Sequence, residues 1–263
     1  MIRAKKSLGQ NFLNSKAVAR DIVHAAELTP NETVLEIGPG KGFLTAELLL
    51  SGSHVIAVEK DDRMIPLLQE KFATEIQNKQ FVLLHGDIIE LLNEGSLPLP
   101  KQYKLVANIP YYLTGYILRA FLETKSKPSK MVLMVQKEVA TRIVARDKKE
   151  SILSIAVKAY GEPHFLKKVP ARYFTPAPKV DSAILVINNI SNKNFKTQKQ
   201  EHLFFEIVKN GFAHKRKMLA GNLKDLLGSS TIEILKSAQI KENARAEDVS
   251  LRQWLSLTEK FQP

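Results

Sequence analysis

Short apolar runs alternate with amphipathic helical patterns along about the first 190 residues of the chain. Apolar runs bounded by turn-forming residues are typical of buried parallel strands, and a helical pattern between two such runs supplies a crossover connection. The alternation therefore predicts an α/β domain built on a mostly parallel sheet. We expect its seven strands at residues 33–37, 54–58, 81–84, 104–107, 130–136, 153–160 and 183–187.

The pattern changes after Asn188. A linker rich in lysine and asparagine occupies residues 191–200, and only helical patterns follow it. These patterns predict helices near residues 201–212, 215–227, 231–238 and 251–261. The sequence thus predicts an α/β domain at residues 1–189 and a small all-helical C-terminal domain at residues 190–263.

A glycine-rich turn follows the first expected strand. Gly38, Gly40 and Gly42 stand at alternate positions, and a helical pattern begins directly after them. Because glycine has no Cβ, such a turn lets a ligand approach the bare backbone, although it can also serve close packing alone. The spacing does not fit a dinucleotide fingerprint, whose third glycine would be Phe43, nor a phosphate loop, because Gly42 follows Lys41. An acid followed by three alternating glycines resembles the first motif of S-adenosylmethionine-dependent methyltransferases.

Polar side chains mark the carboxyl ends of the following strands. Glu59 ends the second strand about twenty residues beyond the glycines, where an acid can accept both hydroxyls of a ribose. Asp87, after the third strand, either accepts from the exocyclic amine of an adenine or caps a helix. Gln10 and Asn11 either form a turn or bind the amino-acid end of a ligand. Ligands of such sheets bind at the carboxyl ends of the strands, where Asn108 is also expected.

The turn Asn108-Ile109-Pro110-Tyr111 follows the fourth strand and has a chemical interpretation beside a purely structural one. The exocyclic amine of adenine is a poor nucleophile, because its lone pair is delocalised into the ring. A side-chain amide oxygen and a backbone carbonyl that accept from this amine stabilise the positive charge that grows as a methyl group arrives. Pro110 stiffens the turn, and Tyr111 offers a ring face to a base drawn out of its stack.

Phe174 opens a second stiff loop, residues 174–183, which contains two prolines and precedes the last expected strand. Its ring is either a core residue that covers the sheet or the second stacking face for a base. The sequence leaves both alternatives open.

The net charge of +12 is concentrated at the two ends of the chain. Residues 1–20 carry five Lys or Arg and no acid, and residues 190–263 carry thirteen bases against eight acids. Basic ends on a nearly neutral body predict a bound polyanion, with a generally basic surface as the alternative. The candidate RNA-binding residues are Lys5, Lys6, Lys215, Arg216 and Lys217. The last three belong to the stretch 212–219, which combines bases with apolar anchors, as in a phosphate-contacting helix or in an amphipathic helix with snorkelling lysines.

The composition makes several kinds of site and location unexpected for this chain. The chain has no cysteine, which excludes disulfides and thiolate metal sites and is typical of a reducing cytoplasm. The six histidines lack metal-ligand spacing, so we expect no metal. No apolar run approaches the roughly 18 residues of a membrane span, and the basic N-terminus lacks the apolar core of a secretory signal. We therefore expect a cytoplasmic protein that does not enter a membrane.

Several motifs occur together in order over nearly the whole chain. They are Gln10-Asn11-Phe12-Leu13, Glu36-Ile37-Gly38-Pro39-Gly40, Glu59, Gly86-Asp87, Asn108-Ile109-Pro110-Tyr111, Gln136-Lys137-Glu138-Val139-Ala140, the 174–183 loop, Lys215-Arg216-Lys217 and Arg245-Ala246-Glu247-Asp248. This set resembles the ribosomal RNA adenine dimethyltransferases, nearest to the bacterial small-subunit type whose loss gives kasugamycin resistance. The resemblance implies a Rossmann-like class I fold. It also implies transfer of two methyl groups to the exocyclic nitrogen of each of two adjacent adenosines, in a hairpin near the 3′ end of 16S rRNA.

The resemblance also implies roles for single residues. In that family the positions matching Asn11, Leu13, Gly38, Glu59, Asp87 and Asn108 contact S-adenosylmethionine, and we expect Gln10 and Gly40 beside them. Tyr111 matches a base-stacking position, and Phe174 would lie across from it. The expected partner is 16S rRNA within a small ribosomal subunit or its precursor, bound by a monomer. One departure is Lys149-Glu150-Ser151-Ile152-Leu153-Ser154, because the family usually has Tyr-Gly before its Leu-Ser here. The departure concerns fine substrate geometry rather than the reaction.

Two rival functions are weighed against this one. A macrolide-resistance methylase would act on 23S rRNA, but Val180-Asp181-Ser182-Ala183 and the long C-terminal tail look more like the small-subunit type. A ribosome-assembly factor that binds RNA without catalysis would not need Glu59, Asp87 and the Asn108 turn intact.

Overall fold

The computed structural model describes residues 4–5 and 8–261, and the chain divides into two compact units. The first unit holds the residues up to Ala140 together with Glu162–Ile190. The second holds Thr141–Gly161 and the residues from Ser191 onward. The sequence predicts a boundary at residue 189, and this division differs from it because residues 141–161 group with the C-terminal helices.

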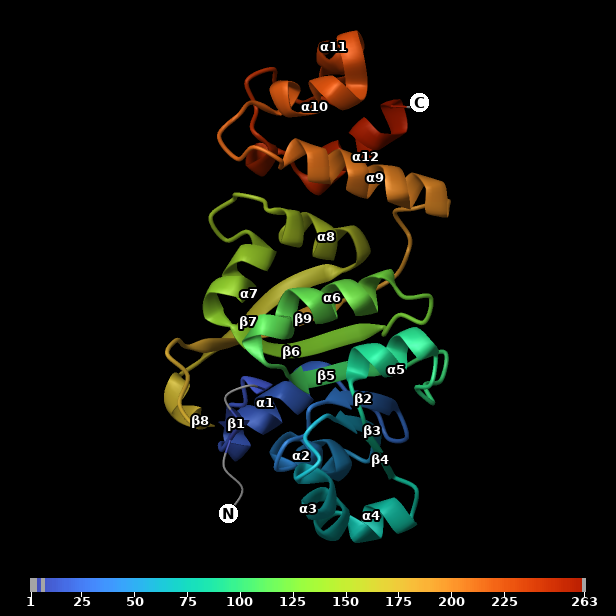
Figure 1. The fold of residues 1–263 in the computed structure, drawn as a ribbon, viewed down its shortest axis with the longest axis vertical. Coiled ribbons are helices and arrows are strands. Elements are labelled where there is room, and N and C mark those ends of the chain that lie inside the picture. The colour runs from blue at the N-terminus through green and yellow to red at the C-terminus, as the bar shows by residue number, and fades with distance from the viewer. Residues whose placement is uncertain (1–3, 6–7, 262–263) are drawn as a thin grey trace. The chain divides into compact units, whose positions relative to one another are not determined.

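A seven-stranded sheet forms the centre of the first unit (Figure 1). Its strands lie in the order β4 (Phe81–His85), β3 (His54–Glu59), β2 (Thr33–Ile37), β5 (Lys104–Asn108), β6 (Lys130–Gln136), β9 (Ser182–Asn188) and β7 (Glu162–Val169). The five strands from β4 to β6 are parallel, and β9 runs antiparallel to both β6 and β7. The expected α/β fold with a mostly parallel seven-stranded sheet is confirmed.

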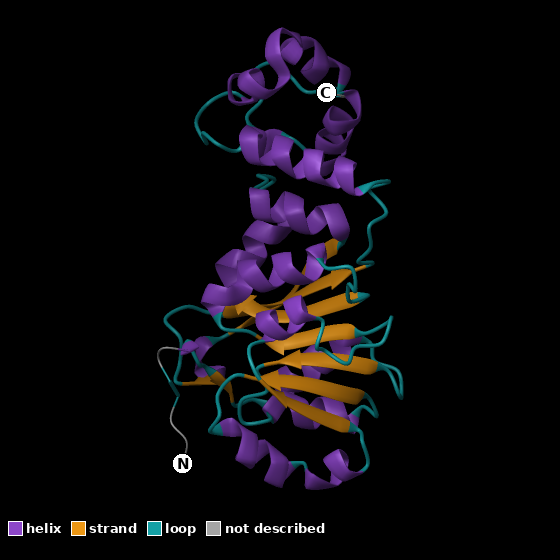
Figure 2. Ribbon diagram, turned by 45° about the vertical axis from the view of Figure 1, so that its right-hand side comes forward, coloured by secondary structure: helices purple, strands orange, loops and turns teal. Residues whose placement is uncertain are grey.

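The central strands are buried on both faces, which explains their nearly continuous apolar runs. Val34, Val106 and Val132 belong to the cluster that includes α1 (Lys16–Ala26) and α2 (Phe43–Leu50). Helices lie on both sides of the strands, as Figure 2 shows. The remaining helical segments of this unit are α3 (Met64–Lys71), α4 (Ala73–Gln77), α5 (Ile88–Glu94), η2 (Tyr111–Leu113), α6 (Thr114–Glu123) and η3 (Ala171–Tyr173).

The strand expected at residues 153–160 is wrong, because this segment is the helix α8 (Ile152–Tyr160). Ser151 caps it, and the hydroxyl of Ser154 completes the capping box with the Ser151 backbone. Serine in place of the usual Glu or Gln makes this start signal hard to see in the sequence. The strand that belongs here, β7, lies at the sheet edge and is mostly exposed, so it shows no apolar run.

The second unit is helical. It includes α8 and the end of α7 (Lys137–Val144), which begins in the first unit. Its later helical segments are α9 (Gln198–Gly211), α10 (Leu219–Leu227), η4 (Gly228–Ser230), α11 (Thr231–Ser237), η5 (Ala246–Asp248) and α12 (Leu251–Lys260). The ring of Trp254 is fully buried and stacks on Phe212 at 5.8 Å between centroids. The basic residues 215–217 precede α10 in a turn, so the helix expected to contain them begins later. Among the described residues, no helix has the length and apolar character needed to cross a membrane.

Candidate active site

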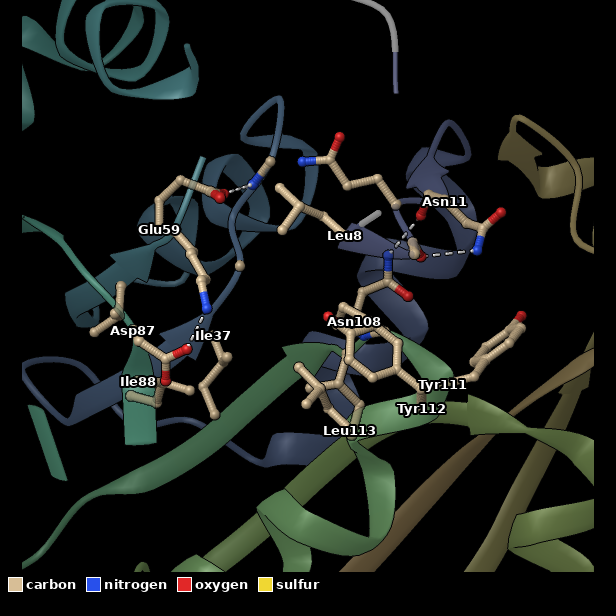
Figure 3. A pocket seen from close by; sticks show the side chains of 18 of the residues that line it. Leu8, Asn11, Ile37, Glu59, Asp87, Ile88, Asn108, Tyr111, Tyr112 and Leu113 are labelled. Atoms are coloured by element: carbon tan, nitrogen blue, oxygen red, sulfur yellow. Dashed lines mark hydrogen bonds and ion pairs between the residues drawn. The ribbon is translucent and has the colours of Figure 1, made fainter. Parts of the chain in front are cut away.

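A pocket opens at the carboxyl ends of β2, β3, β4 and β5, where the glycine turn, Glu59, Asp87 and Asn108 meet. The N-terminal loop, residues 8–12, closes a further side of the pocket. Figure 3 shows Glu59 and Asp87 on one side of this space, with Asn108, Tyr111 and Tyr112 on the other. Most of the residues expected at the site are therefore brought together from distant parts of the sequence. They are Gln10, Asn11, Gly38, Gly40, Glu59, Asp87, Asn108, Ile109, Pro110 and Tyr111.

The glycine turn leaves free space at the pocket. Gly38 has φ +65°, and a Cβ built on it would have no heavy atom within 4 Å. Its N–H donates to the carbonyl of Val58 at 2.9 Å, which ties the turn to the neighbouring strand. Gly42 has a different role, because a Cβ there would lie 2.5 Å from the ring of Phe72. The turn therefore leaves open space at Gly38 and packs closely at Gly42.

Glu59 is held by backbone donors at the end of β3. Its Oε2 accepts from the N–H of Gly40 at 2.9 Å, and its Oε1 accepts from the N–H of Asp61 at 2.8 Å. Burial raises the pKa of the Glu59 carboxyl, while these two N–H donors act in the opposite direction. A carboxylate offers about four acceptor positions. The backbone donors therefore fix the orientation of the Glu59 side chain and leave it with acceptor capacity.

Asp87 is a helix cap that also lies at the wall of the pocket. Its Oδ1 accepts from the N–H of Ile89 at 2.8 Å and so caps α5, and its carboxylate also lines the pocket. Its Oδ2 accepts from the Nζ of Lys60 at 2.6 Å. Burial raises the pKa of Asp87, but the bonds from Lys60 and Ile89 outweigh it, so the pKa lies below its ordinary value. The carboxylate is thus charged and oriented at the pocket wall.

The N-terminal loop is anchored through Asp61, which the sequence did not single out. The side-chain Nε2 of Gln10 donates to Asp61 Oδ2 at 2.8 Å, and Gln10 Oε1 accepts from the N–H of Lys5 at 2.8 Å. Asp61 is almost fully buried and also pairs with Arg63 at 2.6 Å. This guanidinium holds the pKa of Asp61 far below its usual range. Gln10 thus lies at the pocket as part of an ion-paired anchor.

Asn108 is oriented by the same loop. Its Nδ2 donates to the backbone carbonyl of Asn11 at 3.1 Å, while the Nδ2 of Asn11 donates to the carbonyl of Gly9 at 3.2 Å. Because its NH₂ group donates to a carbonyl, the side-chain oxygen of Asn108 keeps its capacity as an acceptor. Tyr111 follows with a half-buried ring whose hydroxyl lies 2.6 Å from the Oγ of Ser182.

Leu13 and Phe174 do not line the pocket. They pair with each other across the two short strands β1 (Phe12–Leu13) and β8 (Phe174–Thr175), and both side chains are buried in the core. Phe174 is only 3% exposed, so its ring has no free face for a base. The structure therefore supports the first alternative for Phe174, a core residue, and its buried ring does not support the stacking role.

The basic candidates fall into both units. In the first unit, Lys5 Nζ lies 3.4 Å from a carboxylate oxygen of Asp61, and Lys6 lies outside the described residues. In the second unit, Lys215, Arg216 and Lys217 are exposed in the turn before α10. Arg216 and Lys217 line a shallow pocket there together with Arg245 and Asn243.

Two further pocket residues, Tyr112 and Tyr116, were missed by sequence reasoning. Tyr112 directly follows the Asn108 turn, and Tyr116 lies one helical turn beyond it. Their spacing of four residues indicates a shared helical face, but the sequence does not reveal that this face is exposed at the mouth of the pocket. Within the described part of the chain, no group of three His, Cys, Asp or Glu side chains is placed to hold a metal ion.

A mostly parallel sheet with a glycine turn, a fixed acid and a polar turn at its carboxyl edge defines a Rossmann-like class I methyltransferase. The model of the ribosomal RNA adenine dimethylase family matches residues 1–263, so the chain belongs to that family.

Individual relatives agree with this membership. A ribosomal RNA small subunit methyltransferase A of Dehalococcoides mccartyi strain CBDB1 is 44% identical over 259 residues, covering 97% of this chain and 88% of the relative. The protein of that name from Fusobacterium nucleatum is 37% identical and covers 98% and 97%. Among solved structures, the 23S rRNA methyltransferase ErmE is 27% identical with a TM-score of 0.78, covering 95% and 99%. A dimethyladenosine transferase from Plasmodium falciparum is 26% identical with a TM-score of 0.79, covering 94% and 95%.

Proposed function

We propose that this chain dimethylates the exocyclic nitrogen of each of two adjacent adenosines near the 3′ end of 16S rRNA, with S-adenosylmethionine as donor. The observation that carries the proposal is the position of Asn108. Its side chain is held by Asn11 in the pocket that also contains Glu59 and the glycine turn. A polar acceptor for a nucleobase amine and a ribose-accepting acid therefore share one space.

The pocket residues fit an S-adenosylmethionine molecule. Glu59 retains acceptor capacity for a ribose hydroxyl, and the open face of Gly38 admits a ligand against the backbone. The carboxylate of Asp87 suits the exocyclic amine of the cofactor's adenine, and Gln10 and Asn11 suit its amino-acid end. When bound, the cofactor supplies an activated methyl group on a sulfonium.

Asn108 and the Ile109 carbonyl supply the acceptors for the target adenine. Accepting from the exocyclic NH₂ group favours the pyramidal nitrogen that attacks, and it stabilises the positive charge that forms on this nitrogen. Pro110 limits the motion of the turn, so these acceptors need little reorganisation. Tyr111 offers its ring to the extruded base, and its bond to Ser182 fixes the ring.

The second unit is proposed to grip the RNA. Lys215, Arg216 and Lys217 are exposed together in one turn, where they can neutralise phosphates. The proposed substrate is 16S rRNA within a small subunit or its precursor, which places the enzyme in the cytoplasm, acting as a monomer. The names of relatives up to 44% identical favour the small subunit.

A second candidate, 23S rRNA methylation, is favoured by the likeness to ErmE, at a lower identity of 27%. The deciding experiment offers unmethylated small subunits and unmethylated large subunits separately, with isotope-labelled cofactor. Mass spectrometry of the digested rRNA then maps the modified nucleotides. Two neighbouring dimethyladenosines in 16S rRNA are expected. Label in 23S rRNA would select the second candidate, and no label in either would refute both.

A further inference from the structure

Two tyrosine rings stand exposed at the mouth of the pocket. The residues Tyr112 and Tyr116 are 63% and 53% exposed, and both line the pocket. Tyr112 belongs to η2 and Tyr116 to the first turn of α6, which follows without a break. Residues four apart on a helical segment lie on the same face. The two rings therefore present a shared aromatic surface beside the Asn108 turn.

The position of Tyr112 depends on the N-terminal loop. A Cβ added to Gly9, which has φ +58°, would lie 2.9 Å from Cε1 of Tyr112. The ring therefore packs against this glycine and keeps its opposite side free, as its exposure shows. The other aromatic candidates differ, because Phe174 is buried and the hydroxyl of Tyr111 is occupied by Ser182.

Aromatic rings of this kind suit single-stranded RNA. Every base has a flat π-face, so exposed tyrosines bind unstacked bases with little dependence on sequence. The cofactor does not need these rings, because its proposed contacts, Glu59 and Asp87, lie at the ends of β3 and β4. A site for one target adenine also has to accommodate the nucleotide next to it.

We propose that Tyr112 and Tyr116 form a stacking site for the nucleobase adjacent to the target adenosine. The proposal rests on the proposed function and identifies a substrate element at the same pocket. Tyr111 would then serve the extruded adenine, while Tyr112 and Tyr116 hold its unpaired neighbour at the rim. This arrangement keeps the strand open beside the reacting nucleotide.

The test uses an RNA hairpin with two adjacent adenosines and the fluorescent base 2-aminopurine placed next to the target. Tyr112→Leu and Tyr116→Leu remove the stacking face, whereas Tyr112→Phe and Tyr116→Phe keep it. Leu50→Ala, at an exposed position on α2 outside the pocket lining, is the matched control. Thermal melting and the cofactor Kd are measured for every variant.

Loss of base stacking should weaken binding of the hairpin about 5- to 100-fold in the leucine variants. Quenching of the 2-aminopurine on binding should fall with it. The phenylalanine variants and Leu50→Ala should bind like the unaltered chain, and the cofactor Kd should stay unchanged throughout.

Unchanged hairpin affinity and unchanged quenching in both leucine variants would overturn the proposal. That result would instead favour a protein that docks at these rings. An equal loss of cofactor affinity would also overturn it, because Tyr112 would then act only through the Gly9 loop. The binding readout needs no turnover. Failure of the unaltered chain to methylate rRNA would therefore count against the proposed function, but it would not decide whether the two tyrosines bind a base.

Discussion

The side-chain amide of Asn108 donates to the backbone carbonyl of Asn11 across 3.1 Å. This bond joins the end of β5 to the N-terminal loop, so the proposed acceptor for the target base and one wall of the cofactor pocket are positioned together. Order in the loop therefore bears directly on the orientation of Asn108. Asp61, through Gln10, supplies a second tie between this loop and the sheet.

Asn108→Ala is expected to preserve the fold and most of the RNA affinity but to abolish rapid methyl transfer. Removal of one hydrogen bond to developing charge typically costs roughly 10²–10³ in rate. Single-turnover methylation and filter binding of the same RNA separate the two effects. Asn93→Ala, at an exposed position on α5, is the control and should leave the rate unchanged. Undiminished turnover in Asn108→Ala would refute the role assigned to this side chain.

Glu59→Gln is expected to weaken S-adenosylmethionine binding by about 10- to 100-fold, the range for hydrogen bonds to a charged group. The glutamine amide would place donors where Gly40 N–H, Asp61 N–H and the ribose hydroxyls all require an acceptor. Calorimetric titration of the cofactor measures the change, and RNA affinity should not follow it. Glu70→Gln on the exposed surface of α3 serves as the control. Equal cofactor affinity in Glu59→Gln would place the ribose elsewhere.

Removal of the three charges at Lys215, Arg216 and Lys217 by alanine should lower RNA affinity and flatten its salt dependence. Each phosphate contact contributes roughly 0.7 to 0.9 to the slope of log affinity against log salt. The slope should therefore become shallower by up to about 2 to 3. A triple variant at exposed lysines of the same unit, Lys199, Lys236 and Lys241, controls for net charge. Identical slopes for the two triple variants would indicate a nonspecific effect of charge.

The sheet could be predicted from the sequence because its strands bury both faces. Strands such as β2 and β5 have apolar residues at most positions, so the runs stand out without knowledge of their neighbours. The edge strand β7 has no such requirement, and its exposed lysines hide it. The apolar segment of α8 was taken for a strand, because a short buried run has no periodicity that separates the two.

The site was predictable where strand ends define it. Glu59, Asp87 and Asn108 each follow directly from the order of strands and the rule that ligands bind at carboxyl ends. Phe174 was not decided by the sequence, because its burial depends on pairing with Leu13 from the far end of the chain. The exposure of Tyr112 likewise depends on the Gly9 loop, which no local pattern reveals.

Glu36, the acid ahead of the glycines, has its side chain almost fully buried in β2. Its Oε2 has no hydrogen-bond partner within geometric limits among the described residues, and the hydroxyl of Thr45 lies close to the carboxyl. Burial raises the pKa of Glu36 to about 8 from the ordinary 4.5, and the nearby charge of Glu59 adds to this, against smaller opposing effects of the Thr45 hydroxyl and Lys71. The raised pKa therefore favours the neutral form of this carboxyl in the folded protein at pH 7.

This raised pKa makes the free energy of unfolding depend on pH. Between about 4.5 and 8 the folded chain keeps a proton on Glu36 that the unfolded chain releases, so stability falls as pH rises through this window. The contribution is fully present below pH 4.5 and is lost above about 8. Glu36→Gln, which is neutral at every pH, should remove this dependence. The difference between the two proteins should change by on the order of a few kcal/mol, since each pKa unit corresponds to roughly 1.4 kcal/mol. Urea denaturation at pH 5, 6, 7 and 8 measures it, and parallel curves for both proteins would show that Glu36 is ionised when folded.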